Sequence, residues 1–495
     1  MVLPPRATTS PAEEAWVGEV VADLLPQDLL LLGVPAVERV DRQRAHELLA
    51  IPVVSLTRAT SIRMAESLRV TRIVEGSFGV EGRRLELSLR LLDVGRGTLS
   101  APLIRTSPLE TLPAMVRSLA WDVALAGPLP PRASREAFLA SDKRPQIPLE
   151  ALRAYGGALL SREPGERRKL LARAIALAPA LDGARLELAR LQLDGRETAE
   201  ALATLKPFAS QPQRASRFLE GRGYLDLGRY HDAARLYQAL SAEAPSPGAL
   251  NNYALALLRR SHKEGERASD VLLRAIDAGP LLSEPRFNLG WALLTEGDPE
   301  GAAFWMRGAL KQDPRDTHAK VVLAWSLRQA GHAEEADAEW KDLLARAPSY
   351  EPFASPDPGR RFERIMASEN PPALEKGGWG EPQAAATHLS RGRKLLEGGD
   401  DEGALAELAE AEALDSFSAP THLEIAHILR SRGETERAIA EWRMSLWCRD
   451  DPRARAELAD ALLSVGRRAE ARAEAERSLK AEPGNAVARR ILTPR

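Results

Sequence analysis

The sequence predicts an α+β amino-terminal domain, an antiparallel meander with helices, followed by an all-α superhelical solenoid of repeated helix pairs. Pro280, Pro314 and Pro348 indicate the solenoid, because they follow one another at intervals of 34 residues (314 − 280 and 348 − 314). Leucines alternate with polar residues over 85–91, a period of two that is typical of a half-buried strand. A repeat array has no single deep core, so its expected function is to bind other proteins along an extended surface.

The amino-terminal domain is expected over residues 1–127. The predicted elements are helices at 15–32, around His46 and at 60–68, strands at 70–78, 84–94 and 98–106, and a closing helix at 109–125. Glycine-containing stretches at 79–82 and 95–97 are expected to form the turns between strands, because glycine tolerates positive φ. We expect the helices to cover one face of the meander.

Several short motifs occur in this domain. They are Trp16-Val17-Gly18-Glu19 with Ala22-Asp23-Leu24, Val74-Glu75-Gly76-Ser77, and Leu91-Leu92-Asp93-Val94 with Gly97. Together they resemble the TolB amino-terminal-like domain of bacterial proteins, which often precedes helical repeats. In that family a strand ending in Val-Leu-Pro comes before the Trp-x-Gly-Glu helix. Val2-Leu3-Pro4 opens this chain, so we expect a truncated first strand. The resemblance implies a binding or assembly role and brings no catalytic residue.

Composition excludes several classes of function. The formal net charge is −2 and the pI about 6.5, whereas a nucleic-acid surface needs a basic excess. The one cysteine, Cys448, excludes an intramolecular disulfide and a cysteine-based zinc site. No apolar run is long enough for a transmembrane helix. Met1–Arg6 carries no export signal, so we expect a cytoplasmic protein, or a periplasmic or envelope protein if a segment upstream carries one.

A proline-rich linker is expected at 128–147, and repeats after it. A unit of 34 residues with small residues at fixed points and a proline closing its second helix is similar to the tetratricopeptide repeat (TPR). The third unit is among the clearest, and its marked residues are Gly221, Tyr224, Gly228, Tyr230, Ala233, Tyr237 and Pro245. We expect about six units over 148–348, and about three with a capping helix over 384–495.

The stretch between these two arrays, residues 349–383, is rich in proline and glycine. This composition cannot form a full helix pair, although a helical turn at 362–366 fits the sequence. We interpret the stretch as a loop or hinge. It is either a partner-docking loop or a tolerated insertion, and we favour the insertion.

The first helix of each unit is expected to line the inner face. With unit five starting at Ser283 and unit six at Thr317, two tryptophans 34 residues apart (325 − 291) should lie one above the other. The expected partner-binding residues are Phe287, Asn288, Trp291 and Trp325. Aromatic rings in a groove can anchor an extended peptide, and the asparagine can bond its backbone. The alternative is that the rings pack only between helices, as we expect for Trp305, Trp340 and Trp442.

The repeats contain two further candidate binding sites. Asn252 and Asn288 would suit a clamp for a partner's terminal carboxylate, but His318 and Val322 stand where basic side chains are needed, so the clamp is not supported. His388 and His422 are 34 residues apart (422 − 388). They could share a metal, but no acidic or cysteine partner has the matching spacing, which favours helix packing.

The sequence therefore predicts a bacterial, non-enzymatic scaffold or adaptor that holds a protein or peptide partner in the groove. It contains no HExxH, GxxxxGK, GxSxG or CxxC motif, and we expect no cofactor, metal or nucleic acid. The alternative is a sensory or regulatory part of a signalling system, related to modules attached to kinases, cyclases or transcription regulators. The identity of the partner and the oligomeric state stay open.

Overall fold

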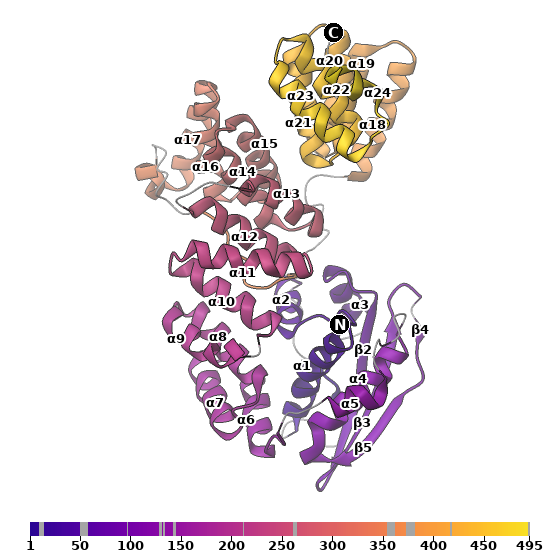
Figure 1. Cartoon of the computed structure of the whole chain (residues 1–495), viewed down its shortest axis with the longest axis vertical. Helices are drawn as coiled ribbons and strands as arrows, with labels where there is room; N and C mark the ends of the chain where they lie inside the picture. Colours follow the sequence, from indigo (N-terminus) through magenta and orange to yellow (C-terminus); the bar gives the residue numbers. More distant parts are fainter. Residues whose placement is uncertain are drawn as a thin grey trace. The chain divides into compact units, whose positions relative to one another are not determined.

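The computed structural model describes residues 1–8, 14–49, 58–96, 98–127, 131, 134–141, 145–210, 212–260, 265–353, 362–372, 382–415 and 418–493. The chain divides into two compact units. The first contains residues 1–282 and 365–374, and the second contains residues 283–364 and 375–495. The first unit therefore begins with the α+β domain and continues into helix pairs, while the second is built from helix pairs (Figure 1).

The amino-terminal domain contains one sheet and several helices. Its elements are β1 (Arg6–Ala7), α1 (Ala15–Leu31), α2 (Arg39–Leu48), α3 (Arg58–Ser67), β2 (Arg72–Glu81), β3 (Arg84–Asp93), β4 (Thr98–Leu99), β5 (Leu103–Pro108), a 3-10 turn (Leu109–Thr111) and α4 (Leu112–Leu125). A short helix, α5 (Arg135–Ala140), follows.

The sheet is mixed, whereas the sequence predicted an antiparallel meander. β2 and β3 form an antiparallel hairpin, and both β4 and β5 pair with the other edge of β3. β1 pairs in parallel with β2, with Arg6 opposite Ser77. Val2 also forms a parallel bridge with Val74, so the expected short first strand is present, but its parallel pairing was not predicted.

One predicted turn and one predicted strand need correction. β2 runs through Gly79 to Glu81, and its turn lies at Gly82, whose φ is +61°. The predicted strand at 98–106 is two strands, β4 and β5, separated around Pro102. Proline has no N–H to donate to a ladder, which explains the interruption.

Helices cover both faces of the sheet, which corrects the expectation of one covered face. Leu85, Leu87, Leu89 and Leu91 form a core with α1 and α4. Ile73 and Leu92 lie opposite each other on β2 and β3 and join a second core with residues of α2 and α3. Successive residues of a strand point to opposite faces, so Leu91 and Leu92 require separate cover.

Helix pairs follow the amino-terminal domain. In the first unit they are α6 (Leu149–Leu160) with α7 (Pro164–Leu177), α8 (Asp182–Asp194) with α9 (Thr198–Leu205), α10 (Arg214–Asp226) with α11 (Tyr230–Glu243), and α12 (Pro247–Arg259) with α13 (Ala268–Ala278). In the second unit they are α14 (Ser283–Glu296) with α15 (Pro299–Gln312), α16 (Thr317–Gln329) with α17 (Ala333–Arg346), α18 (Pro382–Glu397) with α19 (Asp401–Leu414), α20 (Ala419–Ser431) with α21 (Thr435–Cys448), and α22 (Pro452–Ser464) with α23 (Arg468–Ala481), ending with α24 (Ala486–Leu492). The starts predicted for units five and six, Ser283 and Thr317, are those observed.

Small residues stand where two helices of a pair approach closely. A Cβ added at Gly221 of α10 would lie 2.8 Å from the ring of Tyr237 on α11. A Cβ at Gly290 of α14 would lie 2.6 Å from the methyl group of Met306 on α15. Close packing leaves no room for larger side chains at these positions, which explains the fixed small residues of the repeat.

The division between the two units lies between α13 and α14, whereas the sequence placed a break at 349–383. Within the second unit, α15 contacts α20 through Phe304 and His422, whose ring centroids are 5.6 Å apart. The glycines of the expected hinge, Gly377, Gly378 and Gly380, lie outside the described residues. No described helix is long and apolar enough to cross a membrane.

Candidate functional site: a groove occupied by the chain's own segment

Residues 362–372 lie against the helix pairs and have no regular secondary structure. The helical turn considered at 362–366 does not form. Phe362 and Met366 are both buried, with 6% and 3% of their surfaces exposed. Phe362 and Arg364 contact helices of the second unit, and Met366 to Glu369 contact helices of the first.

Phe362 lies between the two tryptophans that the sequence placed on the inner face. Its ring centroid is 5.4 Å from that of Trp291 and 5.5 Å from that of Trp325, in edge-to-face arrangements. The tryptophan rings are 6.3 Å apart and almost fully buried. Aromatic pairs in this geometry add about 0.5–1.5 kcal/mol each to the burial of their area. The two rings therefore form an aromatic pocket, and a phenylalanine of the same chain fills it.

Asn288 holds the backbone of this segment two residues further on. The backbone N–H of Arg364 donates to Asn288 Oδ1 at 2.8 Å, and Asn288 Nδ2 donates to the carbonyl oxygen of Arg364 at 2.9 Å. A carboxamide has both a donor and an acceptor, so one side chain satisfies both groups of a peptide unit. Because the contact is to backbone, it does not depend on the side chain of the bound residue.

The side chain of Arg364 makes two further contacts in the second unit. Its guanidinium lies 3.8 Å above the ring centroid of Phe287, a cation–π geometry. It also forms an ion pair with Asp316, at the start of α16. Phe287 is fully buried. All four predicted groove residues therefore contact Phe362 or Arg364.

Asn252 repeats the backbone contact in the first unit. Met366 N–H donates to Asn252 Oδ1 at 2.8 Å, and Asn252 Nδ2 donates to the Met366 carbonyl at 2.8 Å. The same Nδ2 lies 3.2 Å from the hydroxyl of Tyr237, and Asn251 Nδ2 donates to Asn252 Oδ1 at 3.1 Å. These neighbours fix the orientation of the amide, and Met366 packs against Leu282.

Glu369 is bound by charged and polar groups of the first unit. Its Oε2 accepts from Arg214 Nε at 2.8 Å and from Ser246 Oγ at 3.0 Å, and its carbonyl accepts from the N–H of Gly248 at 2.9 Å. A Cβ at Gly248 would lie 2.1 Å from the Ser368 carbonyl oxygen, so the backbones touch here. Burial raises the pKa of Glu369, and Arg214 opposes this shift.

The two asparagines occupy the same place in their helices. Asn252 is the sixth residue of α12, and Asn288 is the sixth residue of α14. The sequence drew attention to Asn252 only as part of a carboxylate clamp and overlooked its role beside Asn288, although the shared position was a usable signal. Phe362 and Arg364 were missed as groove residues, because a loop that binds its own chain has no periodic signature.

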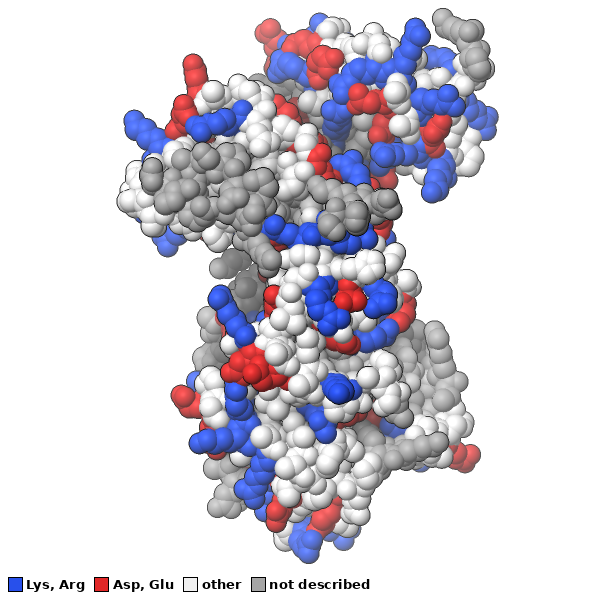
Figure 2. Space-filling view, turned by 60° about the vertical axis from the view of Figure 1, so that its left-hand side comes forward, with Lys and Arg blue, Asp and Glu red and all other residues white. Residues whose placement is uncertain are grey.

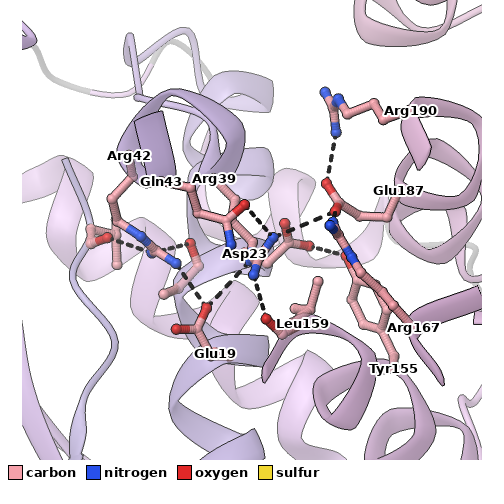
Figure 3. A network of polar contacts seen from close by, with 12 residues as sticks. Glu19, Asp23, Arg39, Arg42, Gln43, Tyr155, Leu159, Arg167, Glu187 and Arg190 are labelled. Atoms are coloured by element: carbon pink, nitrogen blue, oxygen red, sulfur yellow. Dashed lines mark hydrogen bonds and ion pairs between the residues drawn. The ribbon is translucent and has the colours of Figure 1, made fainter. Parts of the chain in front are cut away.

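The sixth residue of α8, Glu187, binds a different part of the chain (Figure 3). Its carboxylate pairs with Arg39 of α2 at 3.4 Å, with Arg190 at 3.1 Å, and with Arg167. Burial opposes ionisation, but these cations, Arg39 first, lower the pKa of Glu187 to about 2. Arg39 itself is almost fully buried and donates to the carbonyl of Leu159 at 2.5 Å.

Near the pair of Arg39 and Glu187, helix α1 supplies further charged and polar partners for α2 and for α6. Glu19, part of the motif noted in the sequence, pairs with Arg39 at 3.3 Å and with Arg42 at 2.9 Å. Asp23 accepts from the hydroxyl of Tyr155 at 2.6 Å, and burial raises the pKa of Asp23 to about 6. The network joins the α+β domain to the first helix pairs through buried charges.

Each of the two histidines has an acidic partner 19 residues later (407 − 388 and 441 − 422), on the second helix of its pair, which corrects the expectation that no acidic residue has a matching spacing. His388 Nδ1 lies 2.7 Å from Glu407, and His422 Nδ1 lies 2.8 Å from Glu441. Among the described residues no group of three metal-ligating side chains occurs. Trp305 and Trp442 are buried as expected, but Trp340 is only partly buried. It lies on α17, where only Ala336 and Leu343 are buried.

Charges of both signs are intermixed on the face drawn in Figure 2. Arg217 with Glu243 and Arg307 with Glu335 are examples of surface ion pairs. The groove contacts above depend on amides, aromatic rings and single charges.

Comparison with known proteins agrees with the helix pairs. The tetratricopeptide repeat family model matches residues 218–282 and 261–317. No curated protein matches the sequence. Among solved structures, the protein MamA of AMB-1 is 20% identical, with a TM-score of 0.31, over 33% of this chain and 98% of its own.

Two other similar structures cover more of this chain. A tetratricopeptide repeat protein from Parabacteroides merdae is 14% identical, with a TM-score of 0.34, over 54% of this chain and 92% of its own. The Cut9–Hcn1 hetero-tetramer of APC/C is 15% identical, with a TM-score of 0.29, over 71% of this chain and 63% of the matched chain. The family match and the helix pairs together support tetratricopeptide repeats over residues 218–317, a fold whose typical role is protein interaction.

Proposed function

We propose that the protein is a non-catalytic scaffold that binds a protein partner as an extended peptide on its repeat helices. The binding residues are Phe287, Asn288, Trp291 and Trp325. Affinity comes from a few buried anchors, and backbone contacts fix the register of the peptide.

One observation carries this proposal. Asn288 bonds both the N–H and the C=O of Arg364, beside an aromatic pocket that holds Phe362. These groups therefore have the geometry to hold a peptide that is not part of a helix.

The amino-terminal domain would dock a second component of the assembly. The support is its resemblance to the TolB amino-terminal-like domain. In this domain Glu19 of the Trp-x-Gly-Glu motif takes part in the buried contacts of α1 with α2. The role of Glu19 would then be to hold the amino-terminal domain against the first helix pairs. One chain would thereby present both the docking domain and the groove.

A display library of random peptides tests the groove. The library is selected against the wild-type chain and against a variant with Arg364→Glu and Glu369→Arg, which reverses two charges of the internal segment. We expect peptides whose binding is lost with Asn288→Ala and kept with Asn485→Ala. Asn485 caps α24, away from Phe362 and Arg364. Finding no Asn288-dependent peptide with either protein would contradict the proposed function.

A further inference from the structure

We propose that Asp316 sets the side-chain specificity of the groove, and that the partner peptide places an arginine in the subsite between Asp316 and Phe287. Every residue of this subsite belongs to the second unit. The specificity rests on the proposed function, and it concerns the place that Arg364 occupies in the structure.

Asp316 is positioned by its own helix and not by the cation that it binds. It is the N-cap of α16, and its Oδ1 accepts from the backbone N–H of Ala319 at 3.1 Å. The second carboxylate oxygen, Oδ2, forms the ion pair with Arg364. The side chain of Asp316 is only 10% exposed. The groove therefore presents one fixed and largely desolvated negative charge, and a preorganised group loses little entropy when a ligand binds.

Phe287 forms the other wall of the subsite. The guanidinium carbon of Arg364 lies 3.8 Å from the centroid of the Phe287 ring, and this ring is fully buried. A guanidinium is planar and weakly hydrated, so it can stack on a ring while it donates hydrogen bonds from its edge. The ammonium of lysine is compact and strongly hydrated. Arginine therefore matches both walls at once, whereas lysine does not.

Asn288 holds the backbone of the same residue whose side chain enters the subsite. Its carboxamide bonds both the N–H and the carbonyl oxygen of Arg364, at 2.8 and 2.9 Å. The side chain thus starts from a fixed point of the peptide. Successive residues of an extended chain point to opposite sides, so an arginine shifted by one place would point away from Asp316. We therefore expect a requirement for arginine at one position of the bound peptide.

The peptides selected from the display library for Asn288-dependent binding test this specificity. We expect them to share an arginine at a fixed position. In a selected peptide, lysine or citrulline in place of this arginine should weaken binding to the whole chain at least about tenfold. Lysine lacks the planar group, and citrulline has the shape of arginine without its charge. Fluorescence anisotropy measures the affinities.

Asp316→Asn is the matched protein variant. Asparagine is as good an N-cap as aspartate, so α16 should keep its start while the negative charge is removed. Competition by the chain's own Arg364 affects all peptides equally, so the readout is the ratio of the affinities for the arginine and citrulline peptides. This ratio should fall to about one with Asp316→Asn.

Asp298→Asn is the control for this variant. Asp298 is the N-cap of α15, where its Oδ1 accepts from the N–H of Gly301 at 3.0 Å. The same exchange there should leave the preference for arginine unchanged. A preference that survives Asp316→Asn would overturn the inference. If that variant does not fold, the wild-type chain decides, because equal affinities for the arginine, lysine and citrulline peptides would overturn the inference as well.

The two proposals can fail separately. If peptides bind in an Asn288-dependent way but share no arginine at a fixed position, the groove function stands and the specificity falls. If no peptide depends on Asn288, both fall.

Discussion

The same helix position behaves differently in the two parts of the repeat array. The sixth residues of α12 and α14 are Asn252 and Asn288, and each binds the backbone of another segment. The sixth residues of α20 and α22 are Glu424 and Glu457. Both pair with His427 of α20, at 3.9 and 2.8 Å, and so bind a side chain instead of a backbone.

The difference shows what a repeat needs in order to hold a peptide. A carboxamide donates and accepts, and so matches the two groups of a peptide unit, whereas an ionised carboxylate only accepts. Glu187 at the sixth position of α8 follows the same rule, because its partner is a guanidinium and not a backbone. Fold supplies the position, and side-chain chemistry decides what binds there.

The largest expected effect comes from removing Glu187. Glu187→Ala leaves Arg39 buried without its partner on α8, and breaking a buried ion pair costs about 3–5 kcal/mol. Urea unfolding followed by circular dichroism should show this loss. The control is Glu457→Ala at the same helix position, where the side chain is 39% exposed and the expected loss is below about 1 kcal/mol. Equal losses would remove the distinction between the two regions.

Removing either asparagine should have the next largest effect. Asn252→Ala or Asn288→Ala leaves buried backbone groups of the internal segment unpaired, at about 1–3 kcal/mol each. Hydrogen exchange should quicken at Met366 in the first variant and at Arg364 in the second. Glu424→Ala serves as the counterpart in the other region and should leave both amides protected. Protection that survives Asn288→Ala would show that its side chain does not hold the segment.

Asp41 of α2 forms a side-chain hydrogen bond with Ser368 of the internal segment, so its titration provides a pH-dependent test of this contact. Burial, and then the charge of Glu38, raise the pKa of Asp41 to about 7. A raised carboxyl pKa means that the folded state binds the extra proton, so stability falls as pH rises from about 4 to about 7. Asp41→Asn should therefore stabilise the chain at pH 8 and have little effect at pH 4. A gain of equal size at both pH values in thermal unfolding would refute this assignment.

The smallest effect is expected at His427. Hydrogen bonds to Glu424 and Glu457 raise the pKa of His427 to about 9. The histidine therefore contributes stability below its unfolded pKa of about 6.5 and loses it as pH rises to about 9. His427→Gln should lower the thermal midpoint slightly at pH 6 and not at pH 10, with His332→Gln as a surface control. NMR titration of His427 would contradict the assignment if its pKa were below 7.

Much of the helical part could be predicted from the sequence. The 34-residue spacing placed the starts of α14 and α16 correctly, because small and large residues must recur wherever identical helix contacts recur. It also placed Trp291 and Trp325 side by side. The α+β domain was predicted less well, since the parallel pairing of its first strand and the cover on both faces leave no periodic trace.

What the groove holds was decided only by the tertiary structure. The composition of 349–383 showed that no helix pair forms there, but not that Phe362 enters the pocket between Trp291 and Trp325 or that Asn288 bonds Arg364. Local sequence determines helices through repeated short-range contacts. Contacts such as Asn252 with Met366 join residues more than a hundred positions apart, and they arise only when folded helices present their inner positions to the rest of the chain.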